Sequence, residues 1–230
     1  MSQQLPLALR LPHAPSLDDF IVGANRNLLD AMRRGIAGHG ERVIFIAGPP
    51  GSGRTHLLLG QCAAMQADDR RCAYVPLDEH VALDPMMLVG LEALDLVAVD
   101  DVQAIAGDEA WERALFNLFN RCRDANCALL FSADAGPAAL PMHLPDLRSR
   151  LAWGLTFALR PLDDDGRLGL LRALARRRAL HMPDEVARYL IERGPRHPGA
   201  LVDAIERLDV SSLAEQRRLT IPFVREQLGL

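Results

Sequence analysis

Residues 43–47 read Val-Ile-Phe-Ile-Ala, and residues 48–55 continue Gly-Pro-Pro-Gly-Ser-Gly-Arg-Thr. Five consecutive apolar residues ahead of a glycine-rich loop are typical of a strand buried in a parallel sheet. A helical pattern begins directly after the loop, at Arg54, and runs to about residue 68. Strand, glycine loop and helix in this order form the context that the pattern G-x-x-x-x-G-K-[ST] requires. The stretch therefore predicts a phosphate group surrounded by backbone N–H groups and the start of a helix.

One position departs from this pattern, because Arg54 stands where the motif has lysine. Lysine acts there as a compact charge between two phosphates, whereas arginine is longer and planar. We expect binding of a diphosphate to survive this change and placement of a third phosphate to suffer. The hydroxyl of Thr55 is the expected ligand of a Mg²⁺ ion. The alternative is a glycine turn that binds no nucleotide, and both the context and the spacing argue against it.

The rest of the chain divides into an alternating part and a helical part. Further strands are expected at 72–77, 94–99, 127–131 and 155–159, and helices at 16–34, 54–68, 85–93 and 108–123. This alternation predicts an α/β fold with a five-stranded parallel sheet covered on both faces. After Pro161 only helical patterns follow, at 163–180, 184–194, 198–209 and 220–228. We expect an N-terminal tail over 1–15, an α/β domain over 16–161 and a small helical domain over 162–230.

Two acidic residues, Asp100 and Asp101, follow the third apolar run, about 45 residues after the glycine loop. In a phosphate-binding fold, a carboxylate at this place holds Mg²⁺ through water, and its neighbour polarises the attacking water. Ser132 and Asp134 follow the fourth strand, where a polar side chain reaches toward the third phosphate. A polar cluster that forms a turn is an equally good interpretation of these last two residues.

An arginine-rich segment, Leu-Arg-Ser-Arg-Leu at 147–151, precedes the fifth strand. An arginine in this position can project from the edge of one subunit toward a phosphate bound by a neighbour, where it stabilises transition-state charge. Plain surface charge is the alternative for a chain with this many arginines. The place of Arg150 in the series of motifs favours the first interpretation.

Composition excludes several classes of protein. All 26 basic residues are arginines, and 30 acidic residues give a net charge of −4, which argues against a general nucleic-acid coat. The sequence has neither an 18-residue apolar run nor a basic and apolar leader, so we expect a cytoplasmic protein without a membrane segment. No pair among the four cysteines has the CxxC spacing of a zinc site, and we expect reduced thiols.

Taken together, these motifs resemble those of the AAA+ ATPases, and in particular of the replication initiator DnaA. The similar segments are Phe-Ile-Val-Gly-Ala-Asn at 20–25, Gly-Arg-Thr-His-Leu-Leu at 53–58, Asp-Asp-Val-Gln at 100–103, Ser-Arg-Leu-Ala-Trp-Gly at 149–154 and Thr-Ile-Pro-Phe-Val-Arg at 220–225. The resemblance spans roughly residues 16–230. It implies an AAA+ P-loop NTPase core with a five-stranded parallel sheet, followed by a small C-terminal helical lid domain.

The resemblance also assigns roles to individual residues. It implies that the nucleotide is bound by Val22, Asn25, Pro50, Gly51, Ser52, Gly53, Arg54, Thr55, His56 and Asp134. Thr55 and, through water, Asp100 would hold Mg²⁺, and Asp101 would be catalytic. Arg150 would be a finger that acts in trans. Gly199 stands where AAA+ proteins usually carry a sensor arginine, which argues further against turnover of ATP by this chain.

The first residues carry a separate signal. Residues 4–9 read Gln-Leu-Pro-Leu-Ala-Leu, similar to the peptide that docks on the bacterial sliding clamp, the beta subunit of DNA polymerase III. Gln4, Leu5, Leu7 and Leu9 are the residues that would bind the clamp. Leu7 and Leu9 suit an apolar groove, while Pro6 keeps the peptide extended. An unstructured terminus is the alternative, because short apolar tails do occur.

The combination resembles the DnaA-homologous regulatory inactivators of the Hda type. That resemblance implies an ADP-bound bridge between the DNA-loaded clamp and DnaA, which stimulates hydrolysis of the ATP on DnaA. We expect such a regulator to have weak or no ATPase activity of its own. We expect no direct sequence-specific DNA binding, because the DNA-binding domain of DnaA would start where Leu230 ends the sequence. An autonomous AAA+ ATPase of the helicase-loader type is one alternative, and an initiator paralogue is another. The resemblance leaves a homodimer or a larger homo-oligomer open.

Overall fold

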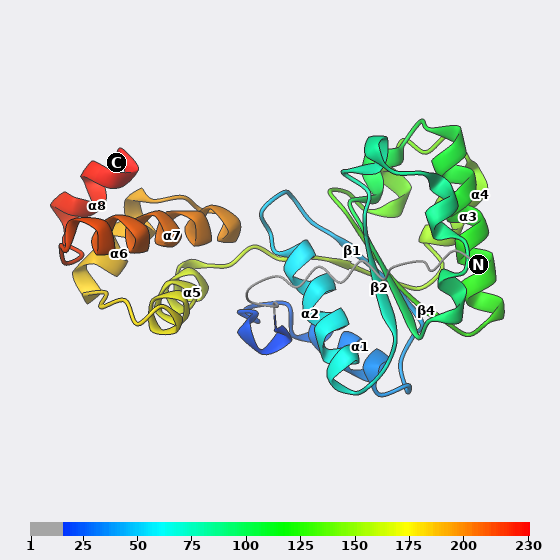
Figure 1. Ribbon diagram of the computed structural model, residues 1–230, viewed down its shortest axis with the longest axis horizontal. Helices are drawn as coiled ribbons and strands as arrows, with labels where there is room; N and C mark the ends of the chain where they lie inside the picture. The colour runs from blue at the N-terminus through cyan, green and yellow to red at the C-terminus, as the bar shows by residue number, and fades with distance from the viewer. Residues whose placement is uncertain (1–15) are drawn as a thin grey trace.

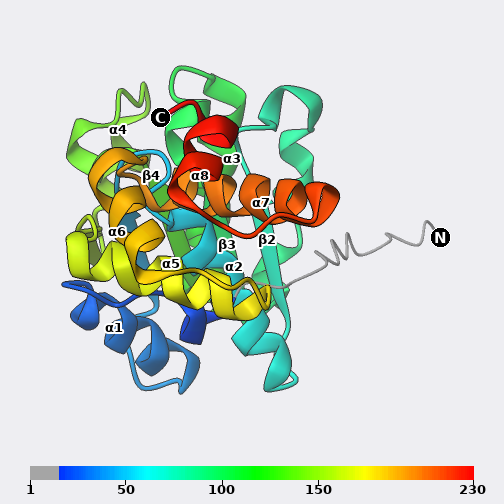
Figure 2. The same cartoon turned by 90° about the vertical axis from the view of Figure 1, so that its left-hand side faces the viewer.

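The computed structural model describes residues 16–230, so the proposed clamp-binding residues Gln4, Leu5, Leu7 and Leu9 lie outside the described residues. The described chain forms two lobes joined by a single extended connection after the fifth strand (Figure 1). One lobe contains a sheet with helices on both faces, and the other contains only helices. Figure 2 views the molecule from the side of the helical lobe.

Five parallel strands form the sheet, which confirms the predicted fold class. They are β1 (Val43–Ala47), β2 (Cys72–Pro76), β3 (Leu96–Asp100), β4 (Ala128–Ala133) and β5 (Leu155–Ala158). Their order is β2-β3-β4-β1-β5, and β1 pairs in parallel with both β4 and β5. Every residue of β1 and β3 is buried, as their uninterrupted apolar runs require. Because parallel strands end at one edge, the glycine loop after β1 and the acids after β3 meet there.

Two pairs of helices cover the sheet (Figure 1). One face carries α1 (Arg26–Ile36) and α2 (Arg54–Ala67), which pack on a core that includes Ile44 and Ile46. The other face carries α3 (Glu109–Asp124) and α4 (Pro145–Leu151), whose core includes Phe45. Successive residues of β1 thus point into opposite layers, which is the alternation expected of a strand covered on both faces.

Local structure differs from the sequence prediction in three places. Residues 85–93 form two 3-10 helices, Pro85–Leu88 and Leu91–Ala93, because Gly90 between them has φ +90° and breaks any continuous helix. Ser16 caps only the 3-10 helix Leu17–Asp19, so the expected helix over 16–34 is wrong in its first half, and α1 begins at Arg26. The third helix of the second lobe runs to Glu215, past the expected end at residue 209.

The helical lobe consists of α5 (Asp164–Arg177), α6 (Asp184–Arg193), α7 (Pro198–Glu215) and α8 (Ile221–Leu228). It has a core of its own, in which Leu171, Leu190, Leu201, Ile205 and Phe223 are fully buried. Asp163 caps α5 by accepting a hydrogen bond from Gly166, and Thr220 caps α8 through Phe223. None of the helices described between residues 16 and 230 combines the length and hydropathy that a membrane crossing requires.

A tight backbone contact fixes the chain between α4 and β5. A Cβ placed on Gly154 would lie 1.9 Å from the carbonyl oxygen of Val43 and 2.7 Å from its carbonyl carbon. Both atoms belong to the backbone at the start of β1, so they cannot yield as a flexible side chain would. Gly154 therefore lets the chain pass directly against β1 before β5 pairs with it.

We predict that Gly154→Ala lowers the free energy of unfolding by about 2–4 kcal/mol, because the added methyl group overlaps main-chain atoms. Urea unfolding of the purified protein measures this change. Gly136→Ala is the matched control, since a Cβ at Gly136 meets nothing within 4 Å. The control should change stability by no more than about 0.5 kcal/mol. Equal stability of the two variants would contradict the tight contact at Gly154.

Candidate functional site

A cavity of about 270 Å³ lies where the glycine loop, the N-terminal segment and the helical lobe meet. The glycine loop and the first turn of α2 form one wall, residues before α1 form the second, and the start of α7 forms the third. The lining residues are Asp19, Phe20, Ile21, Asn25, Gly51, Ser52, Gly53, Arg54, Thr55, His56, Arg160, Leu162, Leu170, Pro198, Gly199 and Val202. The site is therefore completed by residues from both lobes.

The glycine loop has the conformation that a phosphate cradle needs. Gly51 and Gly53 have φ values of +73° and +101°, which side chains rarely tolerate. Gly53 also comes so close to Phe20 that a Cβ would lie 3.2 Å from its ring. The N–H groups in the first turn of α2 have no acceptor within the helix. Among the described residues, the Oγ of Ser52 is buried and has no hydrogen-bond partner. These features fit an anion held by the loop.

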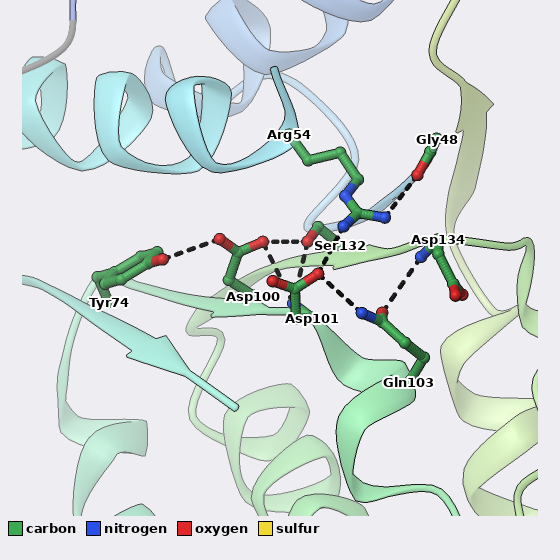
Figure 3. Close-up of polar contacts among 8 residues, drawn as sticks. All are labelled: Gly48, Arg54, Tyr74, Asp100, Asp101, Gln103, Ser132 and Asp134. Atoms are coloured by element: carbon green, nitrogen blue, oxygen red, sulfur yellow. Dashed lines mark hydrogen bonds and ion pairs between the residues drawn. The ribbon is translucent and has the colours of Figure 1, made fainter. Parts of the chain in front are cut away.

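Arg54 is buried and is bound to groups of the protein itself (Figure 3). Its Nη2 donates a hydrogen bond to Oδ1 of Asp101 at 2.6 Å, and its Nη1 donates to the carbonyl oxygen of Gly48. The ion pair joins the start of α2 to the end of β3. Charge-assisted hydrogen bonds of this kind are stronger than neutral ones. The guanidinium is thus directed at the acidic pair and at the base of the loop.

The first of the two acids is held from both neighbouring strands (Figure 3). Asp100 is buried, and its Oδ2 accepts a hydrogen bond from the hydroxyl of Tyr74 on β2 at 2.8 Å. Its Oδ1 accepts from the hydroxyl of Ser132 on β4. Burial and the charge of Asp100 raise the pKa of Tyr74, so the phenol stays protonated and donates. Ser132 therefore supports Asp100, a role that neither sequence interpretation gave it.

The second acid sits in a strained turn and has two donors. Asp101 has φ +54°, and its Oδ1 accepts from Arg54 and, at 2.8 Å, from Nε2 of Gln103. The amide oxygen of Gln103 in turn accepts from the backbone N–H of Asp134 at 3.2 Å. The carboxylate of Asp134 is exposed and points away from this network (Figure 3). Gln103 thus ties the end of β4 to Asp101, a link that only the fold brings together.

The segment before α1 forms one wall of the cavity and also binds the connection between the lobes. Asn25 is 5 % exposed; its Nδ2 donates to the carbonyl of Arg160 at 3.0 Å, and its Oδ1 accepts from the N–H of Arg160 at 2.7 Å. Phe20 and Ile21 line the cavity, whereas Val22 packs against the core under α2. The amide of Asn25 is thus fully used in holding the connection at Arg160.

His56 joins α2 to the same segment. Its Nε2 lies 3.0 Å from the carbonyl oxygen of Ser16, to which it donates. Burial lowers the pKa of His56, so the ring is neutral at neutral pH. Pro50 is exposed and does not line the cavity, whereas Thr55 is exposed and does line it. Thr55 is accordingly the residue of the loop best placed to reach a bound ion.

The helical lobe touches the glycine loop through main-chain atoms. The N–H of Gly199, in the first turn of α7, donates to the carbonyl oxygen of Gly51 at 3.1 Å. A Cβ at Gly199 would lie 3.3 Å from the Cα of Gly51, closer than side chains usually come. Arg177 of α5 adds an ion pair to Asp19 at 2.7 Å. The position that the resemblance assigns to a sensor arginine is therefore pressed against the loop.

Arg150 lies elsewhere, at the end of α4 on the opposite face of the sheet from α2, and it does not line the cavity. Its helix is positioned by Glu112 of α3, a buried carboxylate that accepts hydrogen bonds from the N–H groups of His143 and Leu144 at 3.0 and 2.7 Å. The guanidinium of Arg150 lies over the rings of Trp153 and Phe119. The finger candidate is thus a half-buried cation beside two aromatic rings, away from the cavity.

Comparison with known families decides what these features belong to. Residues 11–158 match the family model described as the bacterial DnaA ATPase domain, and residues 164–228 match the model described as the Hda lid domain. The chain belongs to the bacterial DnaA ATPase domain family. With this lid it is an Hda-type, DnaA-homologous AAA+ protein, a nucleotide-binding, DnaA-related regulator of DNA replication. The predicted resemblance is confirmed.

Solved structures agree on the fold. Domain III of the replication initiation protein DnaA from Thermotoga maritima superposes with a TM-score of 0.81 at 23 % identity, over 93 % of this chain and 95 % of that one. AMPPCP-bound DnaA from Aquifex aeolicus gives 0.75 at 24 % identity, over 87 % and 66 %. The Holliday junction branch migration motor RuvB from Thermotoga maritima gives 0.71 at 17 % identity, over 94 % and 71 %. The two-lobed architecture is therefore that of AAA+ proteins.

We predict that Asn25→Ala lowers the free energy of unfolding by about 2 kcal/mol, because the backbone N–H and carbonyl of Arg160 lose their buried partners. ADP, the nucleotide that the resemblance implies, should bind at least about fivefold more weakly, since one wall of the cavity loosens. Urea unfolding and titration calorimetry measure the two effects. Asn117→Ala, at an exposed asparagine of α3, is the control and should change neither. Unchanged ADP affinity in Asn25→Ala would show that the hydrogen bonds between Asn25 and Arg160 do not shape the cavity.

Proposed function

We propose that this chain regulates replication initiation by bridging the DNA-loaded sliding clamp and DnaA and by stimulating hydrolysis of the ATP bound to DnaA. The observation that carries the proposal is the separation of two arginines. Arg54 is buried and paired with Asp101 beside the chain's own cavity, whereas Arg150 is half-buried at the end of α4, outside the lining of that cavity. The cationic group suited to assist hydrolysis is therefore available to a neighbour and remote from the nucleotide that this chain would hold.

The chain's own residues suit retention of ADP. The glycine loop and the first turn of α2 would hold its phosphates, and Thr55, with Asp100 acting through water, would hold Mg²⁺. Mg²⁺ supplies positive charge to the phosphates when bound. The segment before α1 and the start of α7 would close over the nucleotide, because both line the same cavity. The direct Gly199–Gly51 hydrogen bond favours a closed arrangement from which nucleotide leaves slowly.

Two features of the site disfavour hydrolysis of ATP by this chain itself, namely the hydrogen bonds of Asp101 and the glycine at position 199. Asp101 would have to orient water, yet its Oδ1 is bound to Arg54 and Gln103. Gly199 supplies no side chain where a sensor arginine would assist. This is the argument against the alternative, an autonomous AAA+ ATPase or a protein of the helicase-loader type, because both need productive turnover. We infer that the chain is a nucleotide-binding regulator with weak or no ATPase activity.

The remaining component of the proposal is the clamp contact through Gln4, Leu5, Leu7 and Leu9. It rests on the sequence pattern alone. The pattern places two leucines on one side of an extended peptide, which suits an apolar groove. A tail of this kind would bring Arg150 to DnaA molecules near DNA, since tethering raises the effective concentration of the tethered group.

We predict that the protein stimulates ATP hydrolysis by purified DnaA when clamp is loaded on DNA, and that Arg150→Ala reduces this stimulation at least about 100-fold, because a finger arginine contributes 10³–10⁵ in rate. Release of labelled phosphate from DnaA preloaded with ATP measures it. Arg148→Ala, an exposed arginine on the same helix, is the matched control and should stimulate normally.

The clamp-tail variant separates bridging from the finger. Replacing Leu7 and Leu9 together with Ala should abolish clamp binding and, with it, stimulation, while Arg150→Ala should still bind the clamp. Stimulation that persists at full strength without the two leucines would contradict the bridging mechanism. Full stimulation by Arg150→Ala would contradict the finger.

A further inference from the structure

Trp153 is an exposed aromatic residue whose ring contacts two arginine side chains. It lies in the short turn between α4 and β5 and is 59 % exposed. Two guanidinium groups lie over its ring: that of Arg150 at 5.2 Å and that of Arg123 at 5.8 Å from the ring centroid. Cations at such distances are attracted by the negative face of the ring, and tryptophan is the best partner for them. The ring therefore joins an arginine of α4 to an arginine of α3.

The guanidinium of Arg150 has a second ring beside it. Phe119 of α3 lies 5.9 Å from the guanidinium carbon and is buried. Phe119 is itself stacked on Phe131 of β4, with ring centroids 6.4 Å apart and an angle of 14° between the planes. One ring near Arg150 is thus anchored in the core, and the other is at the surface. Arg150 is half-buried and is confined between these two rings.

The backbone determines where the ring of Trp153 can be. The N–H of Trp153 donates to the carbonyl oxygen of Arg150 at 3.0 Å, which closes the end of α4. The next residue, Gly154, passes against the carbonyl of Val43. Trp153 is consequently held on both sides, by a helix end and by the edge of β1.

Arg123 projects from α3 and Arg150 from α4, so side chains of two helices contact the ring of Trp153. Its Nη2 lies 3.5 Å from Oδ1 of Asp124, which offsets part of its charge. Two guanidinium groups near one ring would otherwise repel each other. Arg123 thus contacts the ring with its charge partly offset by Asp124, whereas Arg150 has no acidic partner among the described residues.

We propose that Trp153 is a positioning residue for Arg150. Its ring face keeps the guanidinium in the orientation in which it meets the third phosphate of the ATP on DnaA, with Arg123 stabilising the ring. The inference rests on the proposed function, because it gives that function's finger its geometry. An arginine side chain has many rotamers, and fixing it before the encounter avoids the entropy of ordering it there. A docking patch, by contrast, would affect affinity for DnaA and leave the maximal rate unchanged.

The contact itself can be measured in the isolated protein. The chain has two tryptophans, and Trp111 is 3 % exposed. In a Trp111→Phe background, the fluorescence reports Trp153 alone. Iodide, an anion, should quench it strongly because two guanidinium groups raise the local anion concentration. Arg150→Ala and Arg123→Ala should each lower the iodide quenching constant by about half, while quenching by neutral acrylamide does not fall. Unchanged iodide quenching in both variants would overturn the proposed contact.

The positioning role is tested by titrating DnaA–ATP hydrolysis with each variant on loaded clamp. Trp153→Ala should reduce the maximal rate about tenfold, because a misplaced catalytic group loses rate steeply, with the half-saturating concentration within about twofold of wild type. Trp153→Phe, which keeps a ring face, should recover most of the rate. Leu155→Ala is the control, an exposed apolar residue two positions away, and should match wild type.

The outcomes separate the two claims. If wild type stimulates DnaA and Trp153→Ala either matches it or changes only the half-saturating concentration, the positioning role is overturned and the proposed function stands. If wild type does not stimulate DnaA at all, the proposed function fails and the positioning role fails with it. A fall in maximal rate in Trp153→Ala that Trp153→Phe restores supports the inference.

Discussion

The ion pair between Arg54 and Asp101 is the contact on which the nucleotide site depends. It joins the two elements that every phosphate-binding fold of this kind must bring together, the loop after β1 and the acids after β3. Both side chains are largely buried, so removing one partner would leave an uncompensated charge and destabilise the protein by about 3–5 kcal/mol. The pair therefore stabilises the lobe and at the same time occupies one oxygen of the Asp101 carboxylate. In the function proposed above, this one contact both stabilises the lobe and restrains turnover.

The walls of the cavity are tied together mainly through main-chain atoms. Asn25 bonds to the backbone of Arg160, and Gly199 bonds directly to Gly51. Such contacts leave little room for a side chain between lid and loop, which explains why glycine at 199 suits this chain. On the opposite face, Arg150 is presented between two aromatic rings. A nucleotide site closed by main-chain contacts and an arginine set apart from it are the two features on which the proposed function rests.

The sequence was sufficient for the fold because its signals are local. Five apolar runs predicted five strands, and the glycine loop predicted the start of α2. The prediction of one helix over residues 85–93 was wrong, because Gly90 adopts a positive φ that the sequence pattern does not reveal. The bond from Tyr74 to Asp100 could not be predicted, since only the pairing of β2 with β3 places the two residues together. Gln103 is two positions from Asp101 in the sequence, but its bond to Asp134 likewise depends on the fold. The orientation of Arg54 likewise depends on its ion pair with Asp101, a residue 47 positions away in the sequence.

The most direct test of this account is single-turnover hydrolysis of ATP by the isolated protein, wild type against Arg54→Lys, with protein in excess over labelled ATP. Lysine is shorter and cannot span from Asp101 to Gly48 as the planar guanidinium does. We expect negligible hydrolysis by wild type and a rate at least about tenfold higher in Arg54→Lys, because Asp101 is released to orient water. Equal rates in the two proteins would contradict the claim that the Arg54–Asp101 pair restrains turnover.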